Sequence, residues 1–341
     1  MNSFTLTQVD SVAAAVADRV GHAESAYLSG GTNLVDLLKY NVTRPRHLTS
    51  LGHLPLHHIE PLPDGGLRLG ALVTNSATAY DAQVQARYPV LSQSILSGAT
   101  PQLRNAATDG GNLNQRTRCP YFYDLATPCN KREPGTGCSA IAGFNRGHGV
   151  LGTSESCIAT HPSDMCVALA VLEAVVRVQG PEGERTIPIK DYHRLPGDTP
   201  HLDNTLRPGE LVTAIDLPAQ GYAEHFTYLK VRDRTSYAFA TVSVAVGLEM
   251  DGDTIRKARF ALGGVAHKPW RDPEAERLLE GQPASPTAFR RAAALVFAEA
   301  KGYQYNAFKI ELGQRAIVRA LTQAAAMNQA LSPNAFLNSN P

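Results

Sequence analysis

The residues best suited to chemistry are cysteines, and the chain gathers all of them in one segment. It has five cysteines among 341 residues, and all lie between positions 119 and 166. This segment is rich in proline and glycine, which favours irregular loops over helices and strands. Thiolates on loops can be aimed at one point, which suits a soft metal ion or an iron–sulfur cluster. The five positions are Cys119, Cys129, Cys138, Cys157 and Cys166.

The spacing of these cysteines does not choose among disulfides, a metal site and buried small side chains. No interval matches the short C-x2-C pairs of zinc ribbons or bacterial ferredoxins. Cys166 is set apart because residues 163–174 repeat apolar side chains with the period of a helix. A cysteine in such a helix is usually a small core residue. The ligand candidates are therefore Cys119, Cys129, Cys138 and Cys157, and four unrelated reduced thiols are the alternative.

Two glycine pairs, far apart in the sequence, have hydroxyl and amide side chains beside them. The first is Ser-Gly-Gly-Thr-Asn at 29–33, between a predicted strand at 26–28 and a predicted helix at 34–39. The second is Thr-Asp-Gly-Gly-Asn at 108–112. Glycine lets backbone N–H groups approach an anion closely, so two such loops that met in space could hold one extended ligand, such as a dinucleotide. Each could equally be a simple turn, and neither matches the P-loop or the Rossmann pattern.

Composition excludes several classes of protein. The net charge of +1 gives no reason to expect nucleic acid or an anionic membrane as partner. The chain has 43% apolar residues but no run of 18, so we expect no membrane insertion. Residues 1–10 lack a basic start followed by an apolar core, and we therefore expect no signal peptide on this chain. The length predicts two or three domains.

Periodicity and turn signals predict an α+β chain. Hairpins occupy the middle, and a C-terminal module combines antiparallel strands with helices. A helix break is predicted near Pro89 and a domain boundary at Pro218. The predicted helices are 9–20, 34–39, 75–98, 163–174, 286–300 and 305–327, and the predicted strands are 26–28, 59–62, 67–72, 175–179, 185–189, 210–217, 226–231, 239–250 and 254–265.

From end to end the sequence resembles the FAD-binding subunits of the molybdenum hydroxylases, the xanthine dehydrogenase and aldehyde oxidoreductase group. The resemblance implies an α+β fold with a PCMH/VAO-type two-part FAD-binding domain at 1–55 and 56–219. A smaller α+β domain at 220–330 would follow, with an antiparallel sheet plus helices, as in CO dehydrogenase flavoprotein subunits. The matching residues are Ser29-Gly30-Gly31-Thr32-Asn33-Leu34, Thr108 to Asn112, Ser163-Asp164 before an Ala/Leu helix, Lys230, and Gly263-Gly264-Val265.

The cysteines lie in an insertion at about 116–160. This insertion resembles the branch of the family in which the flavin subunit also holds a [4Fe–4S] cluster, which includes the periplasmic aldehyde oxidoreductases and 4-hydroxybenzoyl-CoA reductase. The residues at 118–124 and 157–162 are most similar to those of the aldehyde oxidoreductases. The resemblance thus implies a [4Fe–4S] cluster on Cys119, Cys129, Cys138 and Cys157.

The resemblance also implies which residues contact FAD. The first loop would hold the pyrophosphate chiefly through backbone N–H groups, and a lysine beside the flavin could stabilise a reduced, anionic ring. From the sequence alone, Lys230 would be a surface lysine in a strand with two arginines, and His161 a residue at the start of a helix. Asp124 is a weaker rival of Asp164, and Val212 is included by position only. The implied FAD residues are Tyr27, Leu28, Ser29, Gly30, Gly31, Thr32, Asn33, Leu34, Thr108, Gly111, Asn112, Asp124, His161, Asp164, Val212 and Lys230.

The function implied by the resemblance is electron transfer within a heterotrimer. An aldehyde would be oxidised at a molybdenum cofactor on a large subunit, and electrons would pass through [2Fe–2S] centres of a small subunit to FAD here and then to an external acceptor. A xanthine dehydrogenase or 4-hydroxybenzoyl-CoA reductase type of flavin subunit is the nearest alternative. A stand-alone flavoprotein oxidoreductase and a zinc-stabilised binding module are the others. The resemblance implies the periplasm, reached through a partner's signal, with the cytoplasm as alternative.

Overall fold

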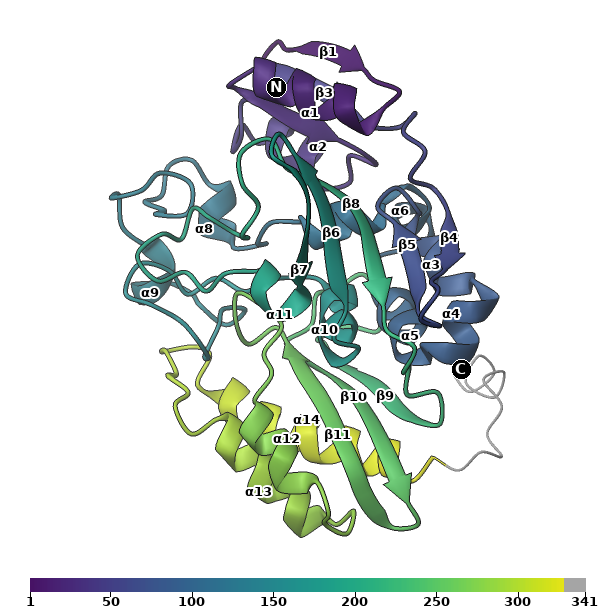
Figure 1. Cartoon of the computed structure of the whole chain (residues 1–341). Coiled ribbons are helices and arrows are strands. Elements are labelled where there is room, and N and C mark those ends of the chain that lie inside the picture. The colour runs from purple at the N-terminus through teal and green to yellow at the C-terminus, as the bar shows by residue number, and fades with distance from the viewer. Residues whose placement is uncertain (328–341) are drawn as a thin grey trace.

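The chain begins with a small parallel sheet flanked by two helices, at the top of Figure 1. The computed structural model describes residues 1–327. The elements of this part are β1 (Thr5–Gln8), α1 (Val12–Gly21), β2 (Ser25–Leu28), α2 (Leu34–Lys39) and β3 (His47–Ser50). The spatial order β1-β3-β2 places β3 between the other two strands. The Ser11 hydroxyl accepts a hydrogen bond from the Ala14 N–H and so caps the start of α1.

The central part is a five-stranded antiparallel sheet with helices packed beside it (Figure 1). In spatial order its strands are β4 (Ile59–Pro61), β5 (Leu67–Gly70), β8 (Leu211–Leu217), β6 (Val175–Gly180) and β7 (Gly183–Pro188). The accompanying helices are α3 (Asn75–Tyr80), α4 (Ala82–Arg87), α5 (Pro89–Ser97), α6 (Pro101–Ala106), α7 (Asp109–Leu113), α10 (Asp164–Val171) and α11 (Ile189–Tyr192). Every residue of α10 is buried, as expected for a helix that is apolar on all sides after its first residue, Asp164.

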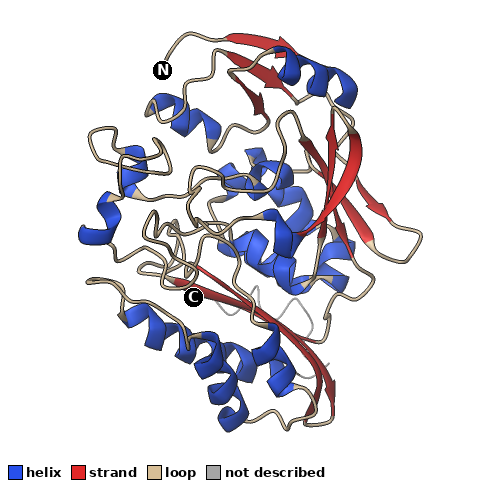
Figure 2. Cartoon of the chain, turned by 60° about the vertical axis from the view of Figure 1, so that its left-hand side comes forward, coloured by secondary structure: helices blue, strands red, loops and turns tan. Residues whose placement is uncertain are grey.

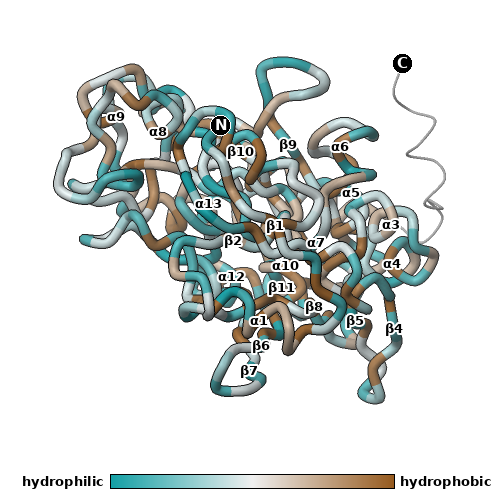
Figure 3. The backbone as a smooth tube through the Cα atoms, turned by 90° about the horizontal axis from the view of Figure 1, so that it is seen from above, coloured by the Kyte–Doolittle hydropathy of each residue, from teal (hydrophilic) through white to brown (hydrophobic). Residues whose placement is uncertain are grey.

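The cysteine-bearing insertion is mostly loop. Its helices are single turns, α8 (Pro120–Tyr123) and α9 (Ser139–Ala142). Seen from above in Figure 3, α8 and α9 lie together at one end of the molecule, away from α3 to α6. The same separation is visible in Figure 1. The insertion is therefore a lateral extension of the central part.

The C-terminal part is a three-stranded antiparallel sheet covered on one face by helices (Figure 2). Its elements are β9 (His225–Val231), β10 (Val242–Asp251), β11 (Thr254–Gly263), α12 (Pro273–Leu279), α13 (Pro286–Val296) and α14 (Phe308–Ala325). Successive side chains of β10 point to opposite faces of the sheet, so the strand contributes to two hydrophobic cores. Val244 and Val246 belong to the core shared with these helices, whereas Ala245 belongs to the core of the central part. The sheet thus joins the two parts through its faces.

The structure confirms most predicted elements and corrects several boundaries. The helix predicted at 75–98 is three helices, because Asp81 ends α3 and its carboxylate caps α4, and because Pro89 begins α5. The predicted break at Pro89 is confirmed, and the one at Asp81 was not predicted. The strands β1 and β3 were also missed; each has four residues and is defined by a distant partner. The domain ranges stay predictions, and residues 328–330 of the third lie outside the described residues.

Among the described residues, no helix has the length and apolar character needed to cross a bilayer.

Candidate functional site

The two glycine loops meet in space. The Ser29 and Thr108 hydroxyl oxygens are 2.8 Å apart and share a hydrogen bond. A Cβ added to Gly30 would lie 1.8 Å from the carbonyl oxygen of Ala106, so the backbones approach as closely as glycine permits. Together the loops line a cleft of about 770 Å³. The condition for one extended ligand held from both sides is therefore met.

The first loop connects β2 to α2. Gly31 has φ +71°, a left-handed conformation that glycine adopts without strain, and its carbonyl accepts the hydrogen bond from the Val35 N–H that begins the helix. The Asn33 side-chain oxygen accepts a hydrogen bond from the Arg116 N–H at 2.9 Å. This bond joins the first loop to the start of the insertion.

The second loop is held from beneath by buried polar groups. Asp109 is fully buried and accepts hydrogen bonds from the Asn75 amide and the Thr78 hydroxyl; burial raises its pKa to about 7. Both polar atoms of the Asn112 side-chain amide are hydrogen-bonded: the nitrogen donates to the Asn75 oxygen, and the oxygen accepts from the Ser163 hydroxyl. The loop therefore cannot turn without breaking bonds to α3 and to Ser163, the residue that caps α10.

A buried ion pair forms the end of the cleft beside α10. Lys230 donates to Asp164 at 2.8 Å, and the two side chains are 4% and 9% exposed. Lys230 also donates to the Ser97 carbonyl, and the Tyr228 hydroxyl donates to the second carboxylate oxygen of Asp164. Lys230 is therefore not a surface lysine, contrary to what the sequence alone favoured. The pair offers a fixed cation and a fixed carboxylate to a ligand in the cleft.

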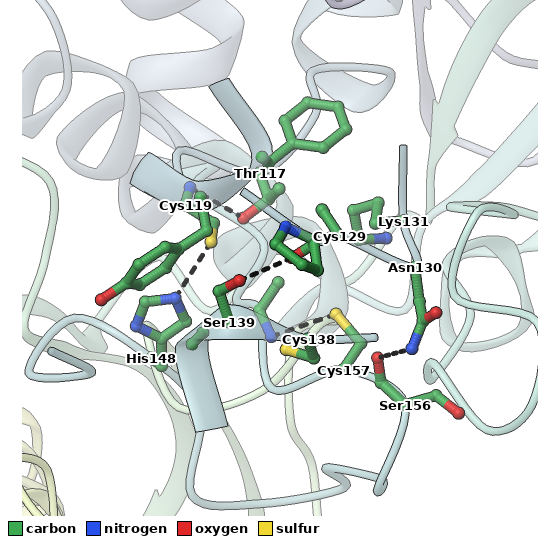
Figure 4. A pocket seen from close by; sticks show the side chains of 15 residues that line it. Thr117, Cys119, Cys129, Asn130, Lys131, Cys138, Ser139, His148, Ser156 and Cys157 are labelled. Atoms are coloured by element: carbon green, nitrogen blue, oxygen red, sulfur yellow. Dashed lines mark hydrogen bonds between the residues drawn. The ribbon is translucent and has the colours of Figure 1, made fainter. Parts of the chain in front are cut away.

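Four of the five cysteines surround one small cavity in the insertion, shown in Figure 4. Cys129 and Cys138 oppose each other as a short antiparallel bridge. The Asn130 side-chain oxygen accepts hydrogen bonds from two backbone N–H groups of the turn between them, those of Gly135 and Gly137. Cys166 lies elsewhere, fully buried in the central core, as predicted. The cavity is lined by Cys119, Cys129, Cys138 and Cys157.

No three of these four sulfurs lie within 4.8 Å of one another. Thiolates around one tetrahedral zinc lie roughly 3.8 Å apart, given Zn–S bonds of about 2.3 Å. Two groups of described residues bring three donor atoms within 4.8 Å of one another, and both lie outside this set of four thiols.

The surroundings of the cavity control ionisation of the thiols. Burial raises the pKa of Cys119 to about 12 and that of Cys157 to about 11. Both thiols therefore need a positive partner to become thiolate ligands. The Lys131 ammonium, 1% exposed, lines the same cavity. His148 Nε2 lies 3.1 Å from the Cys119 sulfur (Figure 4).

The insertion is fastened to the body by one carboxylate, Asp203. Lys131 and Arg116 donate to its two oxygens at 2.7 and 2.5 Å, and His267 Nε2 is 3.3 Å away. Burial alone would raise the pKa of Asp203, but the hydrogen bond with His267 and the charges of Arg116 and Lys131 hold it well below its ordinary value. Asp203 therefore remains ionised and connects the insertion, the loop after α11 and the segment after β11.

Comparison with known proteins agrees with this geometry. Residues 2–220 match the family described as the FAD binding domain in molybdopterin dehydrogenase, and residues 226–326 match the CO dehydrogenase flavoprotein C-terminal domain. The aldehyde oxidoreductase FAD-binding subunit PaoB of Escherichia coli is 48% identical over 330 residues, which cover 96% of this chain and 99% of that one. This chain belongs to the FAD-binding molybdopterin dehydrogenase family.

More distant members of the family agree in fold. The carbon monoxide dehydrogenase medium chain of Afipia carboxidovorans is 26% identical and covers 86% of this chain and 85% of its own. A solved CO dehydrogenase from Oligotropha carboxidovorans superposes with a TM-score of 0.76 at 24% identity, over 96% of this chain and 99% of that chain. The predicted α+β fold, an FAD-binding domain followed by a C-terminal domain, is confirmed. As a member of this family the chain is an FAD-binding oxidoreductase subunit.

The cleft has the chemistry that FAD requires. Asn33 and Arg104 line it, and each has one buried donor, Nδ2 and Nε respectively, without a hydrogen-bond partner among the described residues. Such donors suit the oxygens of a pyrophosphate or ribityl chain. Arg104 was not predicted from the sequence. It is fixed by donating to the Gly98 carbonyl at 2.7 Å, a contact that depends on the fold and that leaves no motif in the sequence.

The predicted FAD residues divide into two sets. Four do not line the cleft: Val212 is buried in β8, Asp124 is in the insertion and accepts from the Ala126 N–H, His161 lines a neighbouring cavity, and Leu28 lies behind Gly31. The roles of individual residues stay predictions. The twelve that line the cleft are Tyr27, Ser29, Gly30, Gly31, Thr32, Asn33, Leu34, Thr108, Gly111, Asn112, Asp164 and Lys230.

Proposed function

We propose that this chain is the FAD- and [4Fe–4S]-binding electron-transfer subunit of a molybdenum-dependent aldehyde oxidoreductase. The observation that carries the proposal is the set of four cysteines around one cavity, in an insertion bonded to the first FAD loop. Aldehyde as the substrate class rests on the 48% identity to a subunit named for that activity. The aldehyde would be oxidised on another chain, and the electrons would leave through this one.

The implied partners are a large subunit with the molybdenum cofactor and a small subunit with [2Fe–2S] centres, in a heterotrimer. Support comes from the relatives, several of which are named as medium chains or subunits. An external acceptor completes the reaction. We place the assembly in the periplasm, exported folded through a partner's signal, on the resemblance to the aldehyde oxidoreductase branch; the cytoplasm is the alternative.

In this assignment the chain's residues bind and position FAD. Bound FAD supplies a carrier that exchanges electrons singly or in pairs. The loops at 29–33 and 108–112 present backbone N–H groups, and Asn33 and Arg104 offer donors to the cofactor's oxygens. The Asp164–Lys230 pair is buried before any ligand arrives, so its cation is already desolvated and oriented beside the cleft.

The cluster assignment rests on the cysteine cavity and its charges. A cluster held by four thiolates is an anion, and Lys131 and Arg116 are the cations held next to the cavity by Asp203. No three of the thiols lie within 4.8 Å of one another, which favours a cluster over a single zinc ion. A zinc-stabilised module therefore fits the geometry less well.

The decisive measurement is cofactor analysis of the chain, alone and co-purified with its partners. We expect one FAD and roughly four irons with acid-labile sulfide per chain. Acetaldehyde or benzaldehyde should bleach the flavin absorbance in the complex but not in the isolated chain. Zinc without iron would support the binding module, and aldehyde turnover by the isolated chain would support a stand-alone flavoprotein. Cys166→Ala should keep its iron and serves as the matched cysteine control.

A further inference from the structure

A cluster of two histidines and one aspartate lies in the N-terminal part, away from the cleft and the cysteine cavity. One ligand atom from each of Asp18, His22 and His47 lies within 4.8 Å of the other two. Asp18 belongs to α1, His22 follows the end of that helix, and His47 begins β3. These elements lie together at the top of Figure 1. Two imidazoles and a carboxylate are a ligand set that zinc takes with a water as fourth ligand.

The separations between the donor atoms suit a single ion. Asp18 Oδ2 lies 2.8 Å from His47 Nε2, and Asp18 Oδ1 lies 3.5 Å from His22 Nδ1. Donor atoms around a tetrahedral ion with bonds of about 2.0–2.1 Å lie roughly 3.3 Å apart. Asp18 and His22 are also four residues apart, the spacing that brings two side chains to one face of a helix. The three side chains are therefore close to the positions that an ion requires.

Hydroxyl groups orient two of the three side chains. The Thr5 hydroxyl lies 2.7 Å from His47 Nδ1 and donates its own hydrogen to the Arg46 carbonyl at 3.4 Å. The Thr5 oxygen therefore accepts from the ring, and His47 Nδ1 carries a proton. The Thr49 hydroxyl donates to Asp18 Oδ2 at 2.6 Å. Outer hydrogen bonds of this kind hold the ligands of a metal site in the binding orientation.

The contact between His47 and Asp18 requires a positive charge between the two atoms. Burial alone would raise the pKa of Asp18, but hydrogen bonds with Thr49 and His47 hold it below its ordinary value, so the carboxylate is ionised. Because His47 Nδ1 carries a proton, Nε2 has either a second proton or a lone pair that faces the carboxylate. Two lone pairs at 2.8 Å repel each other, so a proton or a metal ion lies between them. A metal ion would displace the proton.

His22 can complete the site from the solvent side. Its side chain is 48% exposed, and its ring stacks on the His47 ring with centroids 3.8 Å apart. His22 Nδ1 donates to the Asp18 carbonyl at 2.8 Å. When the exposed ring turns out of the stack, this bond is released, the proton moves to the other nitrogen, and the freed nitrogen can coordinate the ion. A site closed in this way still leaves one position for water.

We propose that Asp18, His22 and His47 form a binding site for one Zn²⁺ ion. The proposal is independent of the electron-transfer function above. The ion would fasten α1 to β3, the middle strand of the small sheet, which pairs with β2 just before the first FAD loop. Mg²⁺ prefers oxygen ligands and retains several waters, so a site with two imidazoles discriminates against it.

His22 is the ligand to replace first, because its side chain is exposed and its loss leaves the buried pair of His47 and Asp18 in place. His22→Gln removes one ligand nitrogen. His53→Gln removes another exposed histidine, which lies outside the cluster, and is the matched control. Asp18→Asn is the second variant, because it keeps the shape of the side chain and removes the charge.

The test uses the untagged full chain loaded with FAD and iron, with Zn²⁺ as probe. Equilibrium dialysis should show one saturable site per chain that excess Mg²⁺ does not occupy. His22→Gln and Asp18→Asn should weaken binding at least ~10-fold, about 1.4 kcal/mol, whereas His53→Gln should bind like the wild type. Zn²⁺ should also raise the urea midpoint of the wild type and of His53→Gln, but not that of His22→Gln.

The outcomes separate this inference from the function above. A wild-type chain with no saturable zinc site overturns the proposal, and so does equal affinity of His22→Gln and the wild type. Competition by Mg²⁺ at equal concentration overturns the assignment to zinc. Zinc held by the cysteines of an iron-free chain is recognised because His22→Gln leaves it unchanged, and that result contradicts the proposed function instead.

Discussion

The FAD cleft and the cysteine insertion are neighbouring sites built in opposite ways. The cleft is lined by two glycine loops, and these loops are anchored by Asp109, Asn112 and α10 in the central core. The insertion has single-turn helices. One small cluster combines its buried Phe122 and Cys129 with Leu37 of α2, and its Val150 and Leu151 are buried in the core of the C-terminal part. The first site exists because the domain folds. The second depends on attachments to the rest of the chain.

Those attachments come from distant parts of the sequence, and several of them are polar. Asp203 holds the insertion from one side, as described above. From the other, Lys309 of α14 donates to the His148 carbonyl at 2.8 Å, and Asn306 donates to the Gly149 carbonyl at 3.1 Å. Buried hydrogen bonds of this kind add to the limited apolar burial of the insertion. Mutations should therefore affect the two sites differently.

The largest difference should appear when one cysteine ligand is removed. We expect Cys138→Ala to lose nearly all of its iron, because a cluster that lacks one thiolate is not retained, while FAD content stays near one per chain. Iron and flavin assays on purified protein measure both. Limited proteolysis should cut the insertion of this variant much faster than that of the wild type, because the cluster no longer joins the loops of the insertion.

The control is Cys166→Ala, which removes a thiol from the central core instead. It should retain its iron and lose about 1–2 kcal/mol of unfolding free energy from the cavity it creates. A Cys138→Ala chain with full iron content would show that this thiol is not a ligand.

The converse experiment disturbs the cleft and spares the insertion. In Gly30→Ala the new Cβ would lie 1.8 Å from the Ala106 carbonyl oxygen, which forces the two FAD loops apart. We expect FAD affinity to fall at least ~1,000-fold, about 4 kcal/mol, with iron content unchanged. Fluorescence titration with FAD measures the affinity. Gly21→Ala, where an added Cβ meets nothing within 4 Å, is the control, and a Gly30→Ala chain that keeps its FAD would contradict the close-approach argument.

The same contrast explains what the sequence could predict. The cleft loops leave short local patterns, and the residues at 29–34 and 108–112 were predicted from them. The cysteine set was also predictable, because Cys166 lies in a stretch with helical periodicity and the other four do not. A site can be predicted from sequence when its residues form a pattern within one short segment.

Contacts between distant segments leave no such signal. Arg104 and Asp203 were not predicted, since each matters only because the fold brings other segments to it. For Lys230 the sequence pattern was misleading. A lysine near two arginines in a strand is expected to be exposed, yet its side chain is buried and hydrogen-bonded to Asp164 and the Ser97 carbonyl. Val212 was included by position and lies in the core of the sheet, outside the cleft.

Loss of the Asp203 attachment should have a smaller effect than loss of a cofactor ligand. Asp203→Asn leaves Lys131 and Arg116 without a counter-charge, and breaking a buried pair in this way costs about 3 kcal/mol. Denaturant unfolding of the loaded chain measures it. The pKa of Asp203 is depressed in the folded chain, so its contribution to stability is present at neutral pH and is lost as pH falls below about 4.

Asp233→Asn, which breaks the exposed pair with Arg146, is the control and should change stability by less than about 1 kcal/mol. Equal effects of the two substitutions would exclude Asp203 as the main attachment.

The smallest effect concerns the attachment from α14. Burial lowers the pKa of Lys309 to about 7, far below the value of about 10.4 for an exposed lysine. Below pH 7 both the folded and the unfolded chain bind this proton, and the folded state pays the full desolvation cost. Between pH 7 and 10 the unfolded chain binds more protons than the folded one, so stability rises with pH.

This group should therefore add about 1 kcal/mol of stability between pH 7 and 8. In Lys309→Met that rise is absent, so the stability gap between variant and wild type should widen as pH increases. Urea unfolding at pH 7, 7.5 and 8 measures the gap. Lys257→Met, at a partly exposed lysine paired with Glu249, should unfold with the pH dependence of the wild type. Parallel curves for Lys309→Met and the wild type would mean that Lys309 stays charged on its two carbonyl oxygens at pH 8, and α14 would then hold the insertion through a cation.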